Sequence, residues 1–190
     1  MTQRLDQLKD NIWKTMRARI IAEKRLDSNQ FHGQLILLWY SFVGVATSIY
    51  YLVYVPHHKI INLFWVIYSI AIFFVSSYIS QSNFQGRADQ MKQCHLALKE
   101  LYYCSEQETG YDALSKKYLD SLKMSGNHKS SDYLRAMCNA KWYGEKIDME
   151  INWYMRLRVY SYFLKKYLLL TICYSMPIFL FILIFFLKWN

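Results

Sequence analysis

Three long apolar runs without a charged side chain dominate the hydrophobic pattern of the chain. They cover residues 35–55, 60–80 and 167–187. A helix needs about 20 mostly apolar residues to cross about 30 Å of hydrocarbon, and each run has this length. Buried helices of a soluble protein are the alternative, but such helices are mostly shorter and keep a polar face. The pattern therefore predicts three transmembrane helices.

The first two runs form a predicted helical hairpin, because only the four residues 56–59 separate them. Pro56 is expected to end the first helix, since proline lacks an N–H and restricts the residue before it. The third run contains Ser175 and Pro177. A kinked or partly re-entrant segment is therefore an alternative to a full crossing.

Helical spacing of apolar residues also marks the segments between the runs. It predicts helices over residues 3–26, 86–108, 112–124 and 132–166. Gly110 is expected to end the second of them, and Gly144 is the weak point of the last, which would lead without interruption into the third apolar run. No stretch shows the alternation of a strand, so the chain is predicted to be all-α.

These elements give the predicted organisation of an all-α membrane protein with one domain. It consists of a basic amphipathic helix (1–33), a transmembrane helical hairpin (34–82), a helical cytoplasmic region (83–166) and a C-terminal transmembrane segment (167–190).

The distribution of charged residues predicts the orientation of the chain in the membrane. The chain has 190 residues, 54% of them hydrophobic, and a net charge of +9. Residues 1–33 carry seven Lys and Arg and residues 83–166 carry fourteen, whereas the hairpin loop and the C-terminal tail carry one each. Basic segments stay in the cytoplasm, so we expect a multi-pass protein with a cytoplasmic N-terminus and no cleaved signal peptide.

The first amphipathic helix has two interpretations. Its apolar stripe consists of Leu5, Leu8, Ile12, Met16 and Ile20. The basic residues around it include Arg17, Arg19, Lys24 and Arg25. The helix either packs its stripe on the other cytoplasmic helices, or it lies on anionic lipid headgroups or binds an acidic trigger. We favour packing, with the basic end available for headgroup or trigger contacts.

Small and hydroxyl residues recur along the three runs at helical spacing. They are Ser41, Gly44 and Ser48 in the first run, Ser69, Ser76 and Ser80 in the second, and Thr171 and Ser175 in the third. Such residues let helices approach closely, and hydroxyls can bond across an interface. Helix packing is the favoured interpretation, and a polar path is the alternative. Three helices cannot enclose a channel alone, so a pore requires a homo-oligomer.

The chain offers little catalytic chemistry. Its four cysteines lack metal-ligand spacing, and it has no glycine-rich phosphate loop and no nucleophile elbow. We therefore expect no cofactor, no metal, no enzymatic activity and no direct binding of nucleic acid. The uncharged runs also disfavour an ion-coupled transporter. His57 and His58 are the candidates for a weaker third interpretation, a lipid-modifying enzyme.

Two stretches of the sequence resemble the sequence patterns of a known protein family. The first is residues 12–26, in which Trp13, Thr15, Arg19, Ala22, Arg25 and Leu26 fit the pattern I-W-x-T-x-x-x-R-x-x-A-x-x-R-L. The second contains Asn127, His128, Asp132 and Tyr133, which follow the pattern E-N-H-x-x-x-D-Y except that Gly126 replaces its Glu. Both stretches, and the order of elements, resemble the SLATT domains, and family five most closely.

The resemblance implies an effector of prokaryotic antiviral systems, located in the bacterial inner membrane. Such effectors are thought to permeabilise that membrane in abortive infection when a sensor is activated. The implied sensors are nucleotidyltransferases, SLOG proteins or reverse transcriptases. A separate sensor protein or a nucleotide second messenger would supply the trigger, since the chain has no recognisable nucleotide-binding domain. The alternative is a non-conducting membrane anchor or scaffold for a soluble defence partner.

Overall fold

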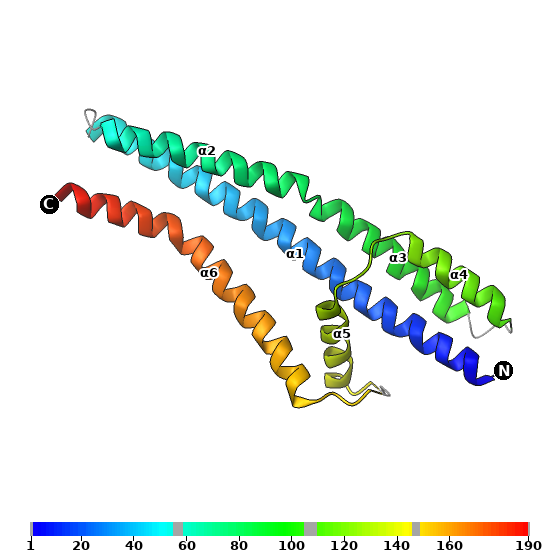
Figure 1. The fold of residues 1–190 in the computed structure, drawn as a ribbon. Coiled ribbons are helices and arrows are strands. Elements are labelled where there is room, and N and C mark those ends of the chain that lie inside the picture. Colours follow the sequence, from blue (N-terminus) through cyan, green and yellow to red (C-terminus); the bar gives the residue numbers. More distant parts are fainter. Residues whose placement is uncertain (1, 55–58, 105–109, 146–148, 190) are drawn as a thin grey trace. The chain divides into compact units, whose positions relative to one another are not determined.

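The computed structural model describes residues 2–54, 59–104, 110–145 and 149–189, and it contains helices without any strand in these ranges. The six helices are α1 (Thr2–Tyr54), α2 (Lys59–Gln81), α3 (Phe84–Cys104), α4 (Tyr111–Lys123), α5 (Ser130–Trp142) and α6 (Trp153–Trp189) (Figure 1). The predicted all-α fold is confirmed. Pro56, His57 and His58 lie outside the described residues.

The chain divides into two compact units. The polar unit contains Met1–Ser28 and Phe84–Tyr162, and the membrane unit contains Asn29–Asn83 and Phe163–Asn190. Helices α1 and α6 each contribute one part to each unit. The predicted boundaries after residues 33, 82 and 166 concern the membrane surface and stay predictions.

The N-terminal half of α1 packs against three other helices of the polar unit, α3, α4 and α5. Leu8 and Ile12 pack against Leu98 of α3 and Leu114 of α4. About three turns farther along α1, Ala22 and Leu26 pack against Ala88 and Met91 of α3. A second face of α1 presents Ala18 and Ile21 to Ala136 and Met137 of α5. These buried positions explain why the apolar stripe of residues 3–26 forms a helix, because the stripe is covered by three other helices.

The amphipathic helix and the first apolar run form one helix. Residues 27–34 between them contain no proline, and their polar side chains do not stop helix propagation. Gly33 is the weakest helix former there, and a Cβ at its position would meet only ordinary contacts with Ile79.

The predicted continuous helix over residues 132–166 is wrong. Helix α5 ends at Trp142, and Gly144 takes φ = 76°, a left-handed conformation that glycine adopts without strain. The Glu145 N–H donates to the Ala140 carbonyl at 3.0 Å, and the Gly144 N–H donates to Lys141 at 3.1 Å. This pair of bonds closes the helix end, so α6 begins anew at Trp153.

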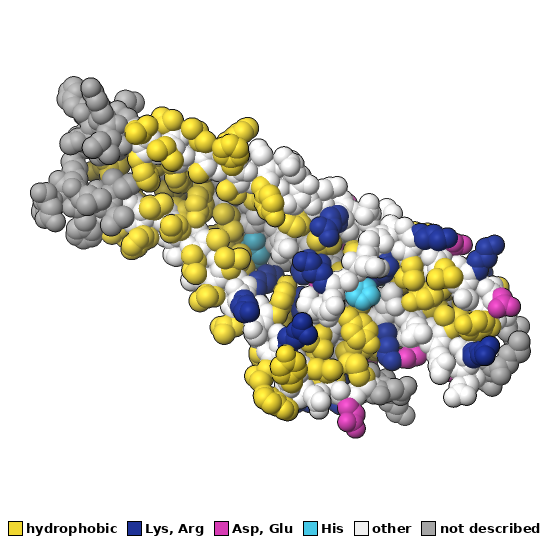
Figure 2. Space-filling model, viewed as in Figure 1, with side chains coloured by type: hydrophobic (Ala, Val, Ile, Leu, Met, Phe, Trp, Pro, Cys, Tyr) yellow, Lys and Arg dark blue, Asp and Glu magenta, His cyan; other side chains and the backbone are white. Residues whose placement is uncertain are grey.

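The membrane unit has the surface expected of a lipid-facing protein. Helical stretches long and apolar enough to cross a membrane lie within Gln3–Tyr51, Leu63–Cys104 and Trp153–Ile182. Their most apolar windows are hardly buried, so large apolar side chains face outward. Figure 2 shows hydrophobic side chains covering the described part of this unit on the face in view. Together with the apolar runs, this exposure establishes a membrane protein.

Helix α6 contains Pro177 and continues to Trp189 without a break. The described segment therefore does not turn back on itself as a re-entrant loop would. The Pro177 ring is buried, and Val43 and Thr47 of α1 and Phe64 of α2 lie around it. Proline is tolerated in such a helix when neighbouring helices pack against the site.

Candidate functional site

An ion pair buried in the polar unit joins α1 to α5. Arg25 donates from Nε to Asp132 Oδ1 at 2.9 Å and from a terminal nitrogen to Asp132 Oδ2 at 3.0 Å. Asp132 Oδ2 also accepts the Lys129 N–H at 3.1 Å, at the start of α5. The Asp132 side chain is fully buried and Arg25 nearly so. Arg25 is therefore engaged by its own chain.

Arg17 has a similar internal partner nearer the surface. Its guanidinium forms an ion pair with Glu145, just after the end of α5, and lies 5.3 Å from the centre of the Trp13 ring. Lys24, by contrast, is exposed. The structure thus separates the four basic candidates, because two are neutralised by carboxylates and one faces solvent.

Arg19 is the unusual member of the four. Its side chain is 1% exposed, yet its partners are neutral. They are the Cys94 sulfur at 2.8 Å, the Ser125 hydroxyl and the Leu122 carbonyl at 3.5 Å. Its Nε has no hydrogen-bond partner, and no ion pair with a carboxylate is found in the described part of the chain. A buried cation without a counter-charge is costly.

The groups around Arg19 do not neutralise it. Burial raises the pKa of the Cys94 thiol despite the opposing effect of Arg19, so the thiol stays protonated near neutral pH. Burial and the Arg19 charge lower the pKa of His128, against the opposing effect of Asp132. The His128 ring stacks on Tyr133 with centroids 6.3 Å apart, and its Nδ1 is buried without a partner. Neither Cys94 nor His128 therefore supplies a negative charge to Arg19.

The remaining residues of the two family motifs occupy different positions in the polar unit. The Thr15 hydroxyl lies 3.0 Å from the Tyr118 hydroxyl of α4, whereas Asn127 is exposed. Ala22 and Leu26 fill the α1–α3 interface. Sequence reasoning missed Cys94, Ser125 and Glu145. Only their distance from the arginines in the fold, which no local pattern records, identifies them.

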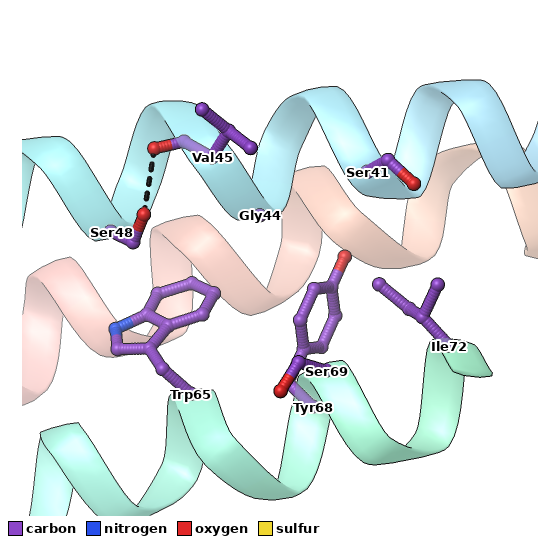
Figure 3. Close-up of a pocket in the computed structure, with 8 residues that line it drawn as sticks. All are labelled: Ser41, Gly44, Val45, Ser48, Trp65, Tyr68, Ser69 and Ile72. Carbon is purple, nitrogen blue, oxygen red and sulfur yellow. Dashed lines mark hydrogen bonds between the residues drawn. The ribbon is translucent and has the colours of Figure 1, made fainter.

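A groove in the membrane unit brings together four of the predicted small residues. Ser41, Gly44 and Ser48 of α1 face Ser69 of α2 across a volume of about 300 Å³. Val45, Trp65, Tyr68 and Ile72 complete the lining (Figure 3). Ser76, Ser80, Thr171 and Ser175 do not line this groove and are exposed on their helices.

The hydroxyls of these helices bond mainly within their own helix. Ser48 donates to the Val45 carbonyl at 2.9 Å, as Figure 3 shows, and Ser69 donates to the Val66 carbonyl at 2.9 Å. Thr171 and Ser175 likewise donate to carbonyls of α6. Hydroxyls satisfied in this way are tolerated in lipid and need not form interhelical bonds.

Aromatic side chains make the polar contacts between helices instead. The Tyr68 hydroxyl of α2 donates to the Tyr40 carbonyl of α1 at 2.9 Å. The Trp39 indole N–H donates to the Tyr174 carbonyl of α6 at 3.1 Å, and the Tyr174 hydroxyl lies 3.1 Å from His32 Nδ1. These contacts tie α2 and the membrane part of α6 to α1. None of them was predicted from the sequence.

Gly44→Val tests the close approach of α1 and α2. A Cβ at Gly44 would lie 2.9 Å from Tyr68 Cε1, and the hydrogen bond to Tyr40 holds that ring in place. We expect a loss of about 1–3 kcal/mol, the usual cost of overpacking, seen as a lower unfolding temperature in detergent. Gly33→Ala is the control, because its Cβ meets Ile79 at an ordinary 3.5 Å. Equal unfolding temperatures for the Gly44 variant and the original chain would contradict this packing.

A comparison with known protein families identifies the family of this chain, which contains both the buried arginines and the groove between α1 and α2. The profile of SMODS and SLOG-associating 2TM effector domain family 5 matches residues 1–186. The chain belongs to this family. No curated protein and no solved structure matches it significantly. The predicted SLATT membership is confirmed, and the chain is a membrane effector domain of a defence-associated family whose description names association with partner proteins.

Proposed function

We propose that this SLATT protein is an antiviral effector that oligomerises in the bacterial inner membrane and permeabilises it in abortive infection. A sensor protein or a nucleotide signal supplies the trigger, and the chain itself is not an enzyme. The distribution of Lys and Arg supports a cytoplasmic N-terminus. In this orientation the polar unit meets a cytoplasmic signal.

The observation that carries the proposal is the sharing of α1 and α6 between the two units. Helix α1, which carries the buried Arg19 and Arg25, and helix α6 both continue as apolar membrane helices. A signal that changes packing in the polar unit therefore acts on helices of the membrane unit directly. Moving a two-state equilibrium from 1:99 to 99:1 needs about 5.5 kcal/mol of differential binding, which several charge-assisted hydrogen bonds can supply.

Membrane permeability suits a defence role for a physical reason. Each elementary charge that crosses a potential of 100 mV releases about 2.3 kcal/mol, so an open pore dissipates the gradient without further energy input. A protein with this effect must be closed at rest. The polar unit provides a candidate latch, since its ion pair between Arg25 and Asp132 holds α1 to α5.

A voltage-sensitive dye tests the proposal in cells that carry the protein together with its flanking genes. We expect depolarisation soon after phage infection and before lysis. The matched control replaces residues 35–55, 60–80 and 167–187 by unrelated spans of the same length. A scaffold would keep its protective activity in this chimaera, whereas a pore former would lose it. Growth arrest with a normal membrane potential would reject the proposal.

A further inference from the structure

We propose that the outward face of α6 between Trp153 and Thr171 is the surface on which two copies of this chain pair, α6 against α6. The inference rests on the proposed function, because pairing of copies supplies the assembly that permeation requires. Its own basis is the spacing and the exposure of side chains on one helix.

The face has the repeat of a coiled-coil seam. Trp153, Tyr160 and Tyr167 follow one another at intervals of seven residues, and Leu157, Leu164 and Thr171 form a second such series. The two series alternate in steps of four and three, and the helix is continuous over this range. A stripe with this spacing fits another helix in knobs-into-holes packing.

The chain leaves this face uncovered. The exposed fractions are 73% for Trp153, 51% for Leu157, 67% for Tyr160, 71% for Leu164 and 61% for Tyr167. The first four residues precede the third apolar run, which is by itself long enough to cross the hydrocarbon. Contiguous exposed apolar side chains outside the hydrocarbon mark an interaction surface.

The opposite side of α6 is already in use. The Tyr162 ring lies 4.5 Å from the guanidinium carbon of Arg135 in α5. The aromatic series itself continues to Tyr174, whose hydroxyl lies 3.1 Å from His32 in the same chain. A seven-residue repeat drifts by about 20° per heptad on a straight helix, so the series turns from the outside toward its own α1. The free seam therefore ends near Thr171.

A second copy fits the seam better than other partners. Copies inserted in one membrane share their direction and depth, so each position on α6 meets its own counterpart in register, as a twofold interface requires. Arg158, Lys165 and Lys166 lie outside the seam in the heptad, and pairing does not bring them face to face. Arg156 alone flanks the seam among the basic residues of this segment.

Photo-crosslinking in membranes tests the seam directly. Benzoylphenylalanine replaces Tyr160 or Leu164 on the seam, and Arg158 in the matched control. We expect an adduct of twice the chain mass from both seam positions and its loss at position 158. Equal yields at the three positions, seam adducts with lipid alone, or seam adducts with a different protein would overturn the proposal.

Charge substitution provides a second measurement. Leu157→Glu places a carboxylate in the seam, whereas Arg158→Glu places one beside it, and both positions are exposed on the helix. We expect the mass in detergent to fall to that of one chain for Leu157→Glu alone, with helix content unchanged. An unchanged mass would overturn the seam. If the copies pair but do not depolarise cells, the result contradicts the proposed pore and still supports pairing along the seam.

Discussion

Asp132→Asn is expected to destabilise the polar unit by about 3–5 kcal/mol, the cost of breaking a buried ion pair. The substitution keeps the shape of the side chain but removes its charge. Arg25 then stays buried without a counter-charge, and the new amide places donor hydrogens opposite the donors of Arg25 or Lys129. A buried arginine and a blocked donor at the start of α5 account for the size of the effect.

Hydrogen exchange of the full-length protein in detergent measures this loss where it arises. We expect the amides of α5 to exchange faster by about a hundredfold to a few thousandfold, because 1.4 kcal/mol corresponds to a factor of ten. The matched control is Asp120→Asn, which removes the exposed pair between Asp120 and Lys123. Such surface pairs contribute little, so exchange in α4 should not change.

The double variant Arg25→Met with Asp132→Leu separates the charge from the packing. Apolar residues of similar volume replace both ions, and such replacements are often neutral or stabilising. We therefore expect most of the protection of α5 to return. If Asp132→Asn alone left exchange unchanged, the buried pair would not hold α1 to α5.

The sequence was sufficient to predict the helices because their pattern is strong and local. The uncharged runs at residues 60–80 and 167–187 lie within α2 and α6, and residues 35–54 of the first run lie within α1. The end of α5 was missed for a physical reason. Apolar spacing continues from Ala140 to Ile151, whereas the stop depends on the backbone conformation of Gly144, and a glycine inside a helical pattern is compatible with either outcome.

The candidate site was predictable only in part. Arg19, Arg25 and Asp132 stand out through the family motifs, but these motifs do not say which side chains meet. The pair between Arg25 and Asp132 joins positions 107 apart in the chain, and the contact of Arg19 with Cys94 joins positions 75 apart. Such pairings arise from tertiary packing, so they require the fold.

Arg19→Met is expected to leave the protein at least as stable as the original and to abolish the depolarisation that we propose for infected cells. Methionine has a similar length and fills the same space without a charge. Arg19 is buried among neutral partners, so its removal relieves desolvation at the cost of its hydrogen bonds to Ser125 and Leu122. Replacing buried ions by apolar residues of this kind often stabilises by about 1–4 kcal/mol.

Two measurements on the Arg19→Met variant test its stability and its function separately. Hydrogen exchange of α1 and α3 reports stability, and the voltage-sensitive dye in infected cells reports function. Arg19→Lys is the matched control, because lysine keeps the charge but lacks the planar fork of donors. A response that survives in the lysine variant assigns the role to the charge, and its loss assigns the role to the fork.

The combination of outcomes decides why a buried charge is present at all. A clear drop in stability for Arg19→Met would mean that the hydrogen bonds outweigh the desolvation of the guanidinium, and Arg19 would then be a structural residue. A stable variant that still depolarises infected cells would exclude Arg19 from signalling. A stable but silent variant would show a residue that lowers stability and is needed for function, the trade-off expected at a functional site. Among the four basic candidates Arg19 alone is both buried and without a carboxylate partner in the described chain, so we expect this third outcome there and not at Arg17 or Arg25.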